Sequence, residues 1–253
     1  MAERLDGTVA LVTGASSGIG AATARALAAQ GAAVALAARR AERLAQLAQD
    51  ITRDGGRALV VEADVTDKAQ AQAAVERTVG ELGRLDTLVN NAGVGLVGPI
   101  LDAPLDEWER MVQLNVLGLL YTTHAALPHL LEAATGGPRR VADLVNVSSE
   151  SGRVAHSGEG VYAATKFGVV AFSESLRQEV TKRHVRVSVV EPGFVATEIF
   201  GHMREEARQQ LMQRLSGVEP MAAEDIANAI GYIVTRPRRV AVNELLIRPT
   251  EEE

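Results

Sequence analysis

Short apolar runs alternate along the chain with longer stretches in which Ala and Leu recur at helical spacing. The runs predict seven strands, at residues 9–13, 33–37, 58–62, 87–90, 141–147, 185–191 and 243–247. The stretches between them predict six helices, near residues 18–30, 40–54, 66–82, 105–131, 162–184 and 222–235. Runs such as VALVT and VRVSVV are apolar on both faces, which is typical of parallel strands covered by helices on each side. The alternation predicts a single-domain α/β protein with a doubly wound, seven-stranded parallel sheet flanked by helices.

Residues 194–220 interrupt this alternation. The segment follows a Pro-Gly pair, carries many charges, and separates the sixth strand from the last helix. A connection this long inside a compact domain is typical of a lid over a site. Between its charges lie the apolar residues Ile199, Phe200, Met203, Leu211 and Met212. We therefore expect a substrate lid at about 194–220, with a polar outer face and an apolar, permissive inner one.

Composition narrows the function classes. The chain has 253 residues, with 26 Lys and Arg against 32 Asp and Glu, a net charge of −6, and no Cys. The lack of Cys excludes a disulfide scaffold, a thiolate metal site and a cysteine nucleophile. The sequence contains no HExxH motif and no carboxylate cluster, so we expect no catalytic metal. The acidic balance argues against a nucleic-acid partner. No apolar run reaches about 18 residues and no signal peptide is evident, so we expect no membrane partner and a cytoplasmic protein.

A glycine-rich turn joins the first predicted strand to the first predicted helix. Its sequence is TGASSGIG, with glycines at positions 14, 18 and 20. Glycines let the backbone turn sharply and let a phosphate approach the free N–H groups at a helix N-terminus. The spacing GxxxGxG departs from the commoner GxGxxG, but the strand-turn-helix context favours a dinucleotide phosphate site.

The end of the second predicted strand indicates which dinucleotide binds. An acidic residue at this point accepts the ribose 2′-hydroxyl of NAD, whereas an Arg accommodates the 2′-phosphate of NADP. Ala38 occupies the position of the acid, and Arg39 and Arg40 follow it. This favours NADP(H), with Arg39 as the main phosphate ligand. Arg40 is interpreted as a solvated residue in the first turn of the next helix, although either arginine can dominate the contact.

Tyr162 and Lys166 carry the candidate chemistry. Residues four apart lie on one face of a helix, so the ammonium can approach the phenol. A cation about 4–5 Å away, at an effective dielectric of about 20, stabilises phenolate by about 3–4 kcal/mol, or about two to three pKa units. Burial opposes this effect, so the cation is required for acid/base work near neutral pH. The alternative from the spacing alone is a half-buried helix face.

The motifs TGASSGIG, ADV, NNAG, a lone Asn at 115, SS, YAATK and PGFVAT occur in this order over about residues 6–250. On these motifs the chain resembles the short-chain dehydrogenase/reductase family, whose fold is a Rossmann domain. By this resemblance Tyr162 is the general acid/base, and Lys166 lowers its pKa and holds the nicotinamide ribose. Ser149 orients the substrate oxygen, and Asn115 supports a water relay to the lysine. Ser148 and Ser151 remain rivals of Ser149.

The resemblance also implies a set of cofactor contacts. Asp64 binds the adenine amino group, Asn91 the adenosine ribose region, and Thr197 the nicotinamide carboxamide or phosphate side. The full implied set is Gly14, Ser16, Ser17, Gly18, Ile19, Gly20, Arg39, Arg40, Asp64, Val65, Asn91, Ala92, Gly93, Tyr162, Lys166, Pro192, Gly193, Val195 and Thr197. The segments GAAVALAARR, FGVVAFSESLRQEV and LLIRPT resemble an NADP-dependent branch of the family that contains serine and 3-hydroxy acid dehydrogenases.

These observations predict one NADP-binding Rossmann domain over residues 1–253 that reduces a small-molecule aldehyde or ketone with NADPH. Two alternatives are a non-catalytic NADP(H)-binding module and a hydroxy-acid dehydrogenase working in the oxidative direction; a third is an isomerase or dehydratase on the same fold. The resemblance also implies a homo-oligomer, specifically a tetramer. The predicted helices 105–131 and 162–184 contain more apolar positions than one core-facing stripe needs. Val169, Val170 and Phe172 are the candidate subunit contacts.

Overall fold

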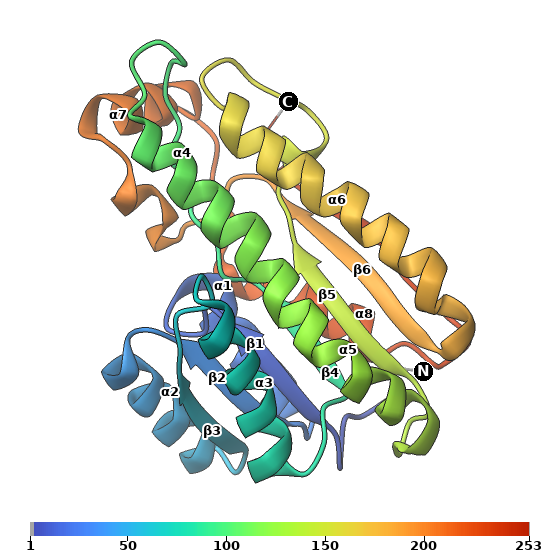
Figure 1. Cartoon of the computed structure of the whole chain (residues 1–253). Coiled ribbons are helices and arrows are strands. Elements are labelled where there is room, and N and C mark those ends of the chain that lie inside the picture. The colour runs from blue at the N-terminus through green and yellow to red at the C-terminus, as the bar shows by residue number, and fades with distance from the viewer. Residues whose placement is uncertain (1–2, 253) are drawn as a thin grey trace.

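The computed structural model describes residues 3–252, which contain one seven-stranded sheet in the order β3-β2-β1-β4-β5-β6-β7 (Figure 1). All neighbouring strands run parallel. The strands are β1 (Val9–Thr13), β2 (Ala33–Ala38), β3 (Arg57–Glu62), β4 (Thr87–Asn90), β5 (Ala142–Val147), β6 (Val185–Pro192) and β7 (Glu244–Ile247). The predicted single-domain, doubly wound Rossmann fold is confirmed, and each predicted strand lies within one residue of its observed bounds at either end.

Helices cover both faces of the sheet. They are α1 (Gly18–Ala29), α2 (Ala41–Arg53), α3 (Lys68–Leu82), α4 (Leu105–Met111), α5 (Leu119–Gly136), α6 (Gly160–Val180), α7 (Glu205–Arg214) and α8 (Ala223–Val234). One core cluster joins α1, α2 and α8 to the sheet, and a second joins α3, α5 and α6 to its other face. Figure 1 shows α3, α5 and α6 in front of the sheet and α8 behind it. Because both faces are covered, the central strands are apolar throughout, as the sequence predicted.

The predicted helix 105–131 is three helical segments. A π-helical turn, Val112–Gly118, separates α4 from α5, and α5 continues past Pro128 to Gly136. A π-turn adds a residue to the helical repeat, so apolar spacing alone does not reveal it, and such turns are frequent at functional sites. It holds Asn115.

Residues 194–220 are not one irregular connection. They contain a 3-10 turn, Glu198–His202, and the helix α7, which the sequence analysis did not predict. The α7 sequence EEARQQLMQR is rich in good helix formers but carries no apolar stripe, and Ala207 is its buried residue. Figure 1 shows α7 beside α4, and Arg204 makes an ion pair with Glu107 of α4 at 3.2 Å.

The order in which strands are added reverses at the centre of the sheet. From β1 the chain adds β2 and β3 on one side, and then β4, β5, β6 and β7 on the other. Ligands of such sheets bind beyond the carboxyl ends of the strands at this switch point. The turns after β1, β4, β5 and β6 carry the glycine-rich, NNAG, SS and Pro-Gly motifs. Among residues 3–252, no helix has both the length and the apolar character needed to cross a membrane.

One of the three candidate subunit contacts is wrong. Val169 is 2% exposed and packs inside the chain, because it lies on the face of α6 that covers the sheet. Phe172 packs partly against the core cluster that joins α3, α5 and α6 to the sheet. The exposed apolar residue of α6 is Phe167, which is 42% exposed.

Candidate active site

The turn between β1 and α1 forms a backbone cradle. Gly14 and Gly18 have φ values of +67° and +51°, in the left-handed region that favours glycine. A Cβ on Gly14 would lie 2.9 Å from the Ala92 Cα, and one on Gly18 would lie 3.2 Å from the Thr197 Cγ2. The turn therefore needs glycine at both positions, and it opens the N-terminus of α1 to an anion.

Asn91 fastens this cradle to β4. Its side-chain Nδ2 donates to the Thr13 carbonyl at 2.9 Å, and its backbone N donates to the Thr13 Oγ1 at 3.0 Å. The Ala92 backbone N donates to the same hydroxyl at 3.1 Å. Gly20 lies beneath the loop, where a Cβ would lie 2.4 Å from the Gly14 carbonyl oxygen. These contacts fix the loop before any ligand binds.

Two arginines follow β2, and their side chains take different directions. Arg39 projects outward with its side chain 64% exposed, 3.7 Å from the Asp64 carboxylate. Arg40 is not merely solvated, because its guanidinium donates to the Ser16 Oγ at 3.0 Å and the Ser17 Oγ at 2.6 Å. The rotamer of Arg40 points back across the loop rather than along α2. A 2′-phosphate at this position would contact a preformed Arg40–serine cluster.

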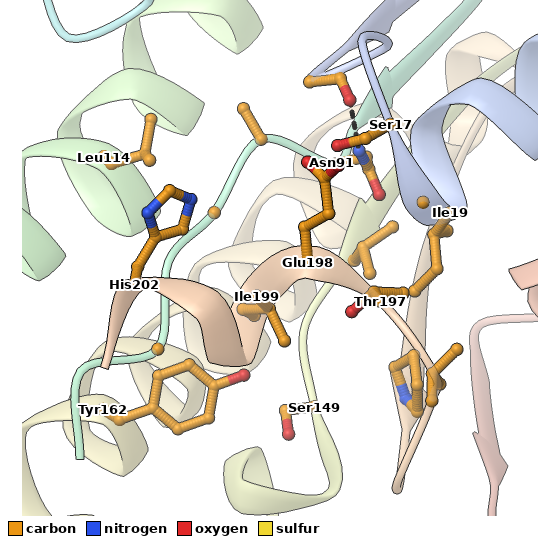
Figure 2. Close-up of a pocket in the computed structure, with 18 of the residues that line it drawn as sticks. Ser17, Ile19, Asn91, Leu114, Ser149, Tyr162, Thr197, Glu198, Ile199 and His202 are labelled. Carbon is orange, nitrogen blue, oxygen red and sulfur yellow. Dashed lines mark hydrogen bonds between the residues drawn. The ribbon is translucent and has the colours of Figure 1, made fainter. Parts of the chain in front are cut away.

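Tyr162 and Lys166 lie on the first two turns of α6 and face the pocket. The Lys166 Nζ is 5.7 Å from the centroid of the Tyr162 ring and donates to the Val147 carbonyl at 3.0 Å. Ser149 follows β5, and Figure 2 shows it below the Tyr162 hydroxyl. The ammonium is thus held by the end of β5, close to the phenol.

The electrostatics of this pair differ from the expectation. Burial raises the pKa of Tyr162 to about 12, and the Glu159 and Glu150 carboxylates add to the rise, while the Ser149 hydroxyl opposes it. Burial lowers the pKa of Lys166 to about 8. Burial and the two carboxylates hold the pKa of the phenol above its ordinary value in the protein alone, opposite to the lowering that the resemblance implies. The phenol is protonated at neutral pH.

The three candidate serines have different partners. The Ser148 hydroxyl donates to the Lys166 backbone carbonyl at 3.0 Å, and the Ser151 hydroxyl donates to the Glu159 carboxylate at 2.7 Å. Ser149 is the one whose hydroxyl interacts with the Tyr162 phenol. The other two hydroxyls hold backbone and carboxylate groups in place.

Asn115 lies behind the pocket, in the π-helical turn. Its Oδ1 accepts from the Val94 backbone N at 2.9 Å, and its Nδ2 donates to the Val94 carbonyl at 2.9 Å and to Thr165 at 3.1 Å. The side chain is 2% exposed and fully bonded. It joins the segment after NNAG to α6, next to the Tyr162 turn.

One pocket of about 340 Å³ brings these groups together. It is lined by every residue expected to bind cofactor except Gly20, and by Ser149, Tyr162 and Lys166 of the expected catalytic set. Gly20 and Asn115 lie outside its lining and support it from behind. Both the glycine cradle and the Arg40–serine cluster open into it, so the residues present fit a dinucleotide with a phosphorylated ribose.

Residues 194–220 form one wall of the pocket. Ile199, Met203 and Leu211 line it, as expected of an apolar inner face, whereas Met212 is 36% exposed. The Phe200 side chain lies outside the described residues. Glu198, His202, Arg214 and Leu215 also line the pocket. The inner face therefore carries charged side chains beside the apolar ones, which corrects the prediction of an apolar inner face.

The comparisons with known proteins agree with this geometry. The family model described as short chain dehydrogenase matches residues 8–208, which is most of the chain. The chain belongs to the short-chain dehydrogenase family. An uncharacterized oxidoreductase of Staphylococcus saprophyticus is 34% identical over 96% of both chains. Glycine betaine reductase of Emericella nidulans is 40% identical over 98% of this chain, but the chain spans only 19% of that protein's length.

Solved structures are similar over nearly the whole chain. The closed form of serine dehydrogenase complexed with NADP+ has a TM-score of 0.88 and 31% identity, covering 97% of this chain and 96% of that one. A short chain dehydrogenase from Burkholderia cenocepacia in complex with NADP has a TM-score of 0.84 and 32% identity, covering 97% and 98% of the two chains.

This short-chain dehydrogenase also has charged pocket residues that the sequence analysis missed. Glu159 is 5% exposed and pairs with Arg214, and Glu150 pairs with Arg248 at 2.7 Å. Glu252 accepts from the Phe194 backbone N at 3.0 Å, and burial together with the Glu150 charge raises its pKa. Glu159 and Arg214 lie 55 residues apart along the chain, Glu252 and Phe194 lie 58 apart, and Glu150 and Arg248 lie 98 apart. No local motif therefore marks these pairs.

Proposed function

We propose that this short-chain dehydrogenase reduces an aldehyde or ketone to an alcohol with NADPH, and that Tyr162 donates the proton. The observation that carries the proposal is a partly buried phenol beside Ser149, in the same pocket as the glycine cradle and the Arg40–serine cluster. NADP in complex with similar structures supports the choice of cofactor.

The cofactor NADP(H) is held at one end of the pocket, which we call the cofactor end: residues 13–20, 38–43, 64–65 and 91–93. The N-terminus of α1 and the glycine cradle receive the pyrophosphate, and Arg40 with Ser16 and Ser17 receives the 2′-phosphate. Asp64 and Val65 would hold the adenine, and Gly193 and Thr197 would hold the nicotinamide side. The bound cofactor supplies a hydride to the carbonyl carbon.

The other end, which we call the substrate end, comprises Ser149, Tyr162, residues 194–220 and Glu252 with its charged neighbours. A phenol with a pKa near 12 is protonated at neutral pH, as donation to a carbonyl oxygen requires. Ser149 orients that oxygen by a hydrogen bond. Lys166 stabilises the phenolate that forms when the proton leaves, because a cation lowers the energy of a nearby anion. Asn115 fixes the segment that positions both groups.

Residues 194–220 act as the substrate lid. Ile199, Met203 and Leu211 supply apolar contact, and the Glu159–Arg214 ion pair fastens α7 to the start of α6. Closure over the substrate excludes water, which strengthens the field of Lys166 on the developing phenolate.

The substrate class is a small aldehyde of secondary metabolism. Three segments, GAAVALAARR, FGVVAFSESLRQEV and LLIRPT, resemble clavaldehyde reductase and support this choice. A non-catalytic NADP(H)-binding module has no use for a buried phenol aligned with a serine and a lysine. Oxidation of a hydroxy acid uses the same residues in reverse and is the second candidate.

A homotetramer is the proposed assembly. Phe167 on α6 and Val112 in the π-helical turn are each 42% exposed, and their two elements are in contact. A second copy would cover such exposed apolar side chains. Light scattering at micromolar concentration should give about four times the chain mass of 26.8 kDa, and a mass of 26.8 kDa would reject the assembly.

The decisive experiment is a panel of aldehydes and ketones screened by loss of NADPH absorbance. We expect turnover with at least one aldehyde, lost in Tyr162→Phe while NADPH binding survives. Tyr232→Phe is the matched control, because Tyr232 is 52% exposed on α8 and lines no part of the pocket. Retained turnover in Tyr162→Phe, or substrate conversion without a net change of cofactor absorbance, would rule out this function.

A further inference from the structure

Glu198 belongs to the lid at residues 194–220, and its side chain reaches the arginines of the cofactor end. Its two carboxylate oxygens accept from the Arg40 guanidinium at 2.7 Å and from the Arg43 guanidinium at 2.6 Å. Figure 2 shows the side chain extending from the turn after Thr197 toward Ser17. One carboxylate therefore bridges two arginines that belong to the segment after β2.

Arg40 lines the pocket at the position proposed for the 2′-phosphate, and Glu198 joins Arg43 to it. Arg40 also donates to the Ser16 and Ser17 hydroxyls of the glycine-rich turn. Ala38 places no acid at the end of β2, so no strand-end acid competes for these donors. Two guanidinium groups and two hydroxyls form a donor set for an anion with three acceptor oxygens. The Glu198 carboxylate satisfies two of the arginine donors with two oxygens.

Resting on the proposed function, we propose that Glu198 competes with the 2′-phosphate of NADP(H) for Arg40 and Arg43, and so helps determine cofactor selectivity. Two anions cannot share these donors without repulsion, so the phosphate must displace the carboxylate. NAD(H) has no 2′-phosphate, so it can bind without displacing it. Glu198 thus weakens the binding of the phosphorylated cofactor in particular.

The competitor is ionised at every working pH. The two arginines lower the pKa of Glu198 to about 2, and Arg40 makes the largest contribution. The groups that face it are Arg40, Arg43 and Ser17 from the cofactor end, with His202 on its own turn. The Glu198 carboxylate therefore stays ionised from pH 5 to pH 9.

The displacement also concerns the lid. Glu198 directly follows Thr197 and begins the 3-10 turn Glu198–His202, whose Ile199 and His202 line the pocket. When the phosphate takes Arg40 and Arg43, the first residues of the lid lose their ion pairs with α2. Binding of NADP(H) therefore releases the start of the lid, whereas binding of NAD(H) leaves it attached.

The test is the binding of four probes to the full chain, measured by calorimetry: NADP+, NAD+, 2′,5′-ADP and 5′-AMP. In Glu198→Gln we expect NADP+ and 2′,5′-ADP to bind about three- to tenfold more tightly. Binding of NAD+ and 5′-AMP should change by less than about twofold. Glu205→Gln is the matched control, because Glu205 pairs with Arg208 inside α7 and should leave all four probes unchanged.

A second variant tests the arginine partner. Arg43→Gln should weaken NADP+ and 2′,5′-ADP binding about three- to tenfold and leave NAD+ unchanged. Weaker NADP+ binding in Glu198→Gln would mean that Glu198 positions Arg40 and would overturn the proposal. Equal tightening of all four probes, or no change, would overturn it as well. Absence of NADP+ binding to the unaltered protein would overturn the proposed function together with it.

Discussion

At the cofactor end, the functional groups lie on short turns that directly follow buried strands, whereas the substrate end gathers Glu159, Arg214 and Glu252 from distant segments. Gly14 and Asn91 are placed by β1 and β4, which pair in parallel and share backbone hydrogen bonds. Arg214 reaches Glu159 only because α7 folds back over the pocket. The comparison teaches that one end is fixed by local backbone geometry and the other by long-range charge pairs. Substitutions at the cofactor end should therefore act through the backbone, and those at the substrate end through the loss of charge pairs.

The largest effect is expected from Gly14→Ala. Its φ of +67° strains any side chain, and the new Cβ would lie 2.9 Å from the Ala92 Cα. The loop must shift, so we expect NADP+ affinity to fall at least about 100-fold and the free energy of unfolding to fall about 1–2 kcal/mol. Gly80→Ala is the control, because nothing lies within 4 Å of its new Cβ in α3, and it should stabilise the protein slightly. Unchanged NADP+ affinity in Gly14→Ala would show that the cradle does not hold the cofactor.

Next in size is the loss of Arg40. Because Arg40 bonds both serines of the turn, Arg40→Ala should lower NADP+ affinity about 10- to 100-fold, from about 1.5–3 kcal/mol of charge-assisted bonding. Arg39→Ala should lower it less than about threefold, because that side chain is 64% exposed. Calorimetric titration of both variants with NADP+ decides the order. The reverse order would restore Arg39 as the main ligand.

At the substrate end, Glu159→Gln and Arg214→Gln break the same ion pair and should both raise KM for the carbonyl substrate about tenfold. They differ in their effect on the pKa of Tyr162. The Glu159 charge raises that pKa. Its removal should therefore move the alkaline fall of the reduction rate to lower pH, by about half a pH unit to one unit. Arg214→Gln leaves the Glu159 carboxylate less neutralised, so the pH at which the reduction rate falls should stay the same or rise. Shifts of the same sign in both variants would mean that the lid contact, and not the charge, sets the profile.

The smallest effect is expected from the apolar lid contacts. Met203→Ala and Leu211→Ala remove pocket wall without touching the cofactor end. We expect the order of aldehydes by kcat/KM to change by several-fold, about 1 kcal/mol per substrate, while NADPH affinity stays within about twofold. Met212→Ala, at an exposed position, is the control. An equal loss of cofactor binding would show that the segment is structural.

The fold and the cofactor end were predictable for a local reason. Apolar runs such as Val9–Thr13 are buried on both faces, and the glycines that follow are required by positive φ and close backbone approach. Both signals are contained in about ten consecutive residues. The position of Arg40 was less predictable, because its rotamer depends on the serines of another turn, which lie 23 and 24 residues away.

The substrate end was predicted only in part. The Tyr162–Lys166 spacing placed both groups on one helix face, but burial of the phenol, which reverses the expected pKa shift, depends on the packed pocket. The helix α7 lacks an apolar stripe, so periodicity did not reveal it. The π-helical turn at Asn115 is likewise invisible to a 3.6-residue pattern.

The central claim is that the protonated Tyr162 phenol donates to a carbonyl oxygen during NADPH-dependent reduction. The most direct measurement is the single-turnover rate of NADPH oxidation by a reactive aldehyde, from pH 6 to pH 10, in the unaltered protein and in Tyr162→Phe. We predict that deprotonation of Tyr162 causes no fall in the rate over this range, because burial raises the pKa of the phenol to about 12. In Tyr162→Phe the rate should fall by at least about 1,000-fold at every pH, with NADPH affinity unchanged within about threefold. A Tyr162→Phe rate within about tenfold of the unaltered protein would contradict the account.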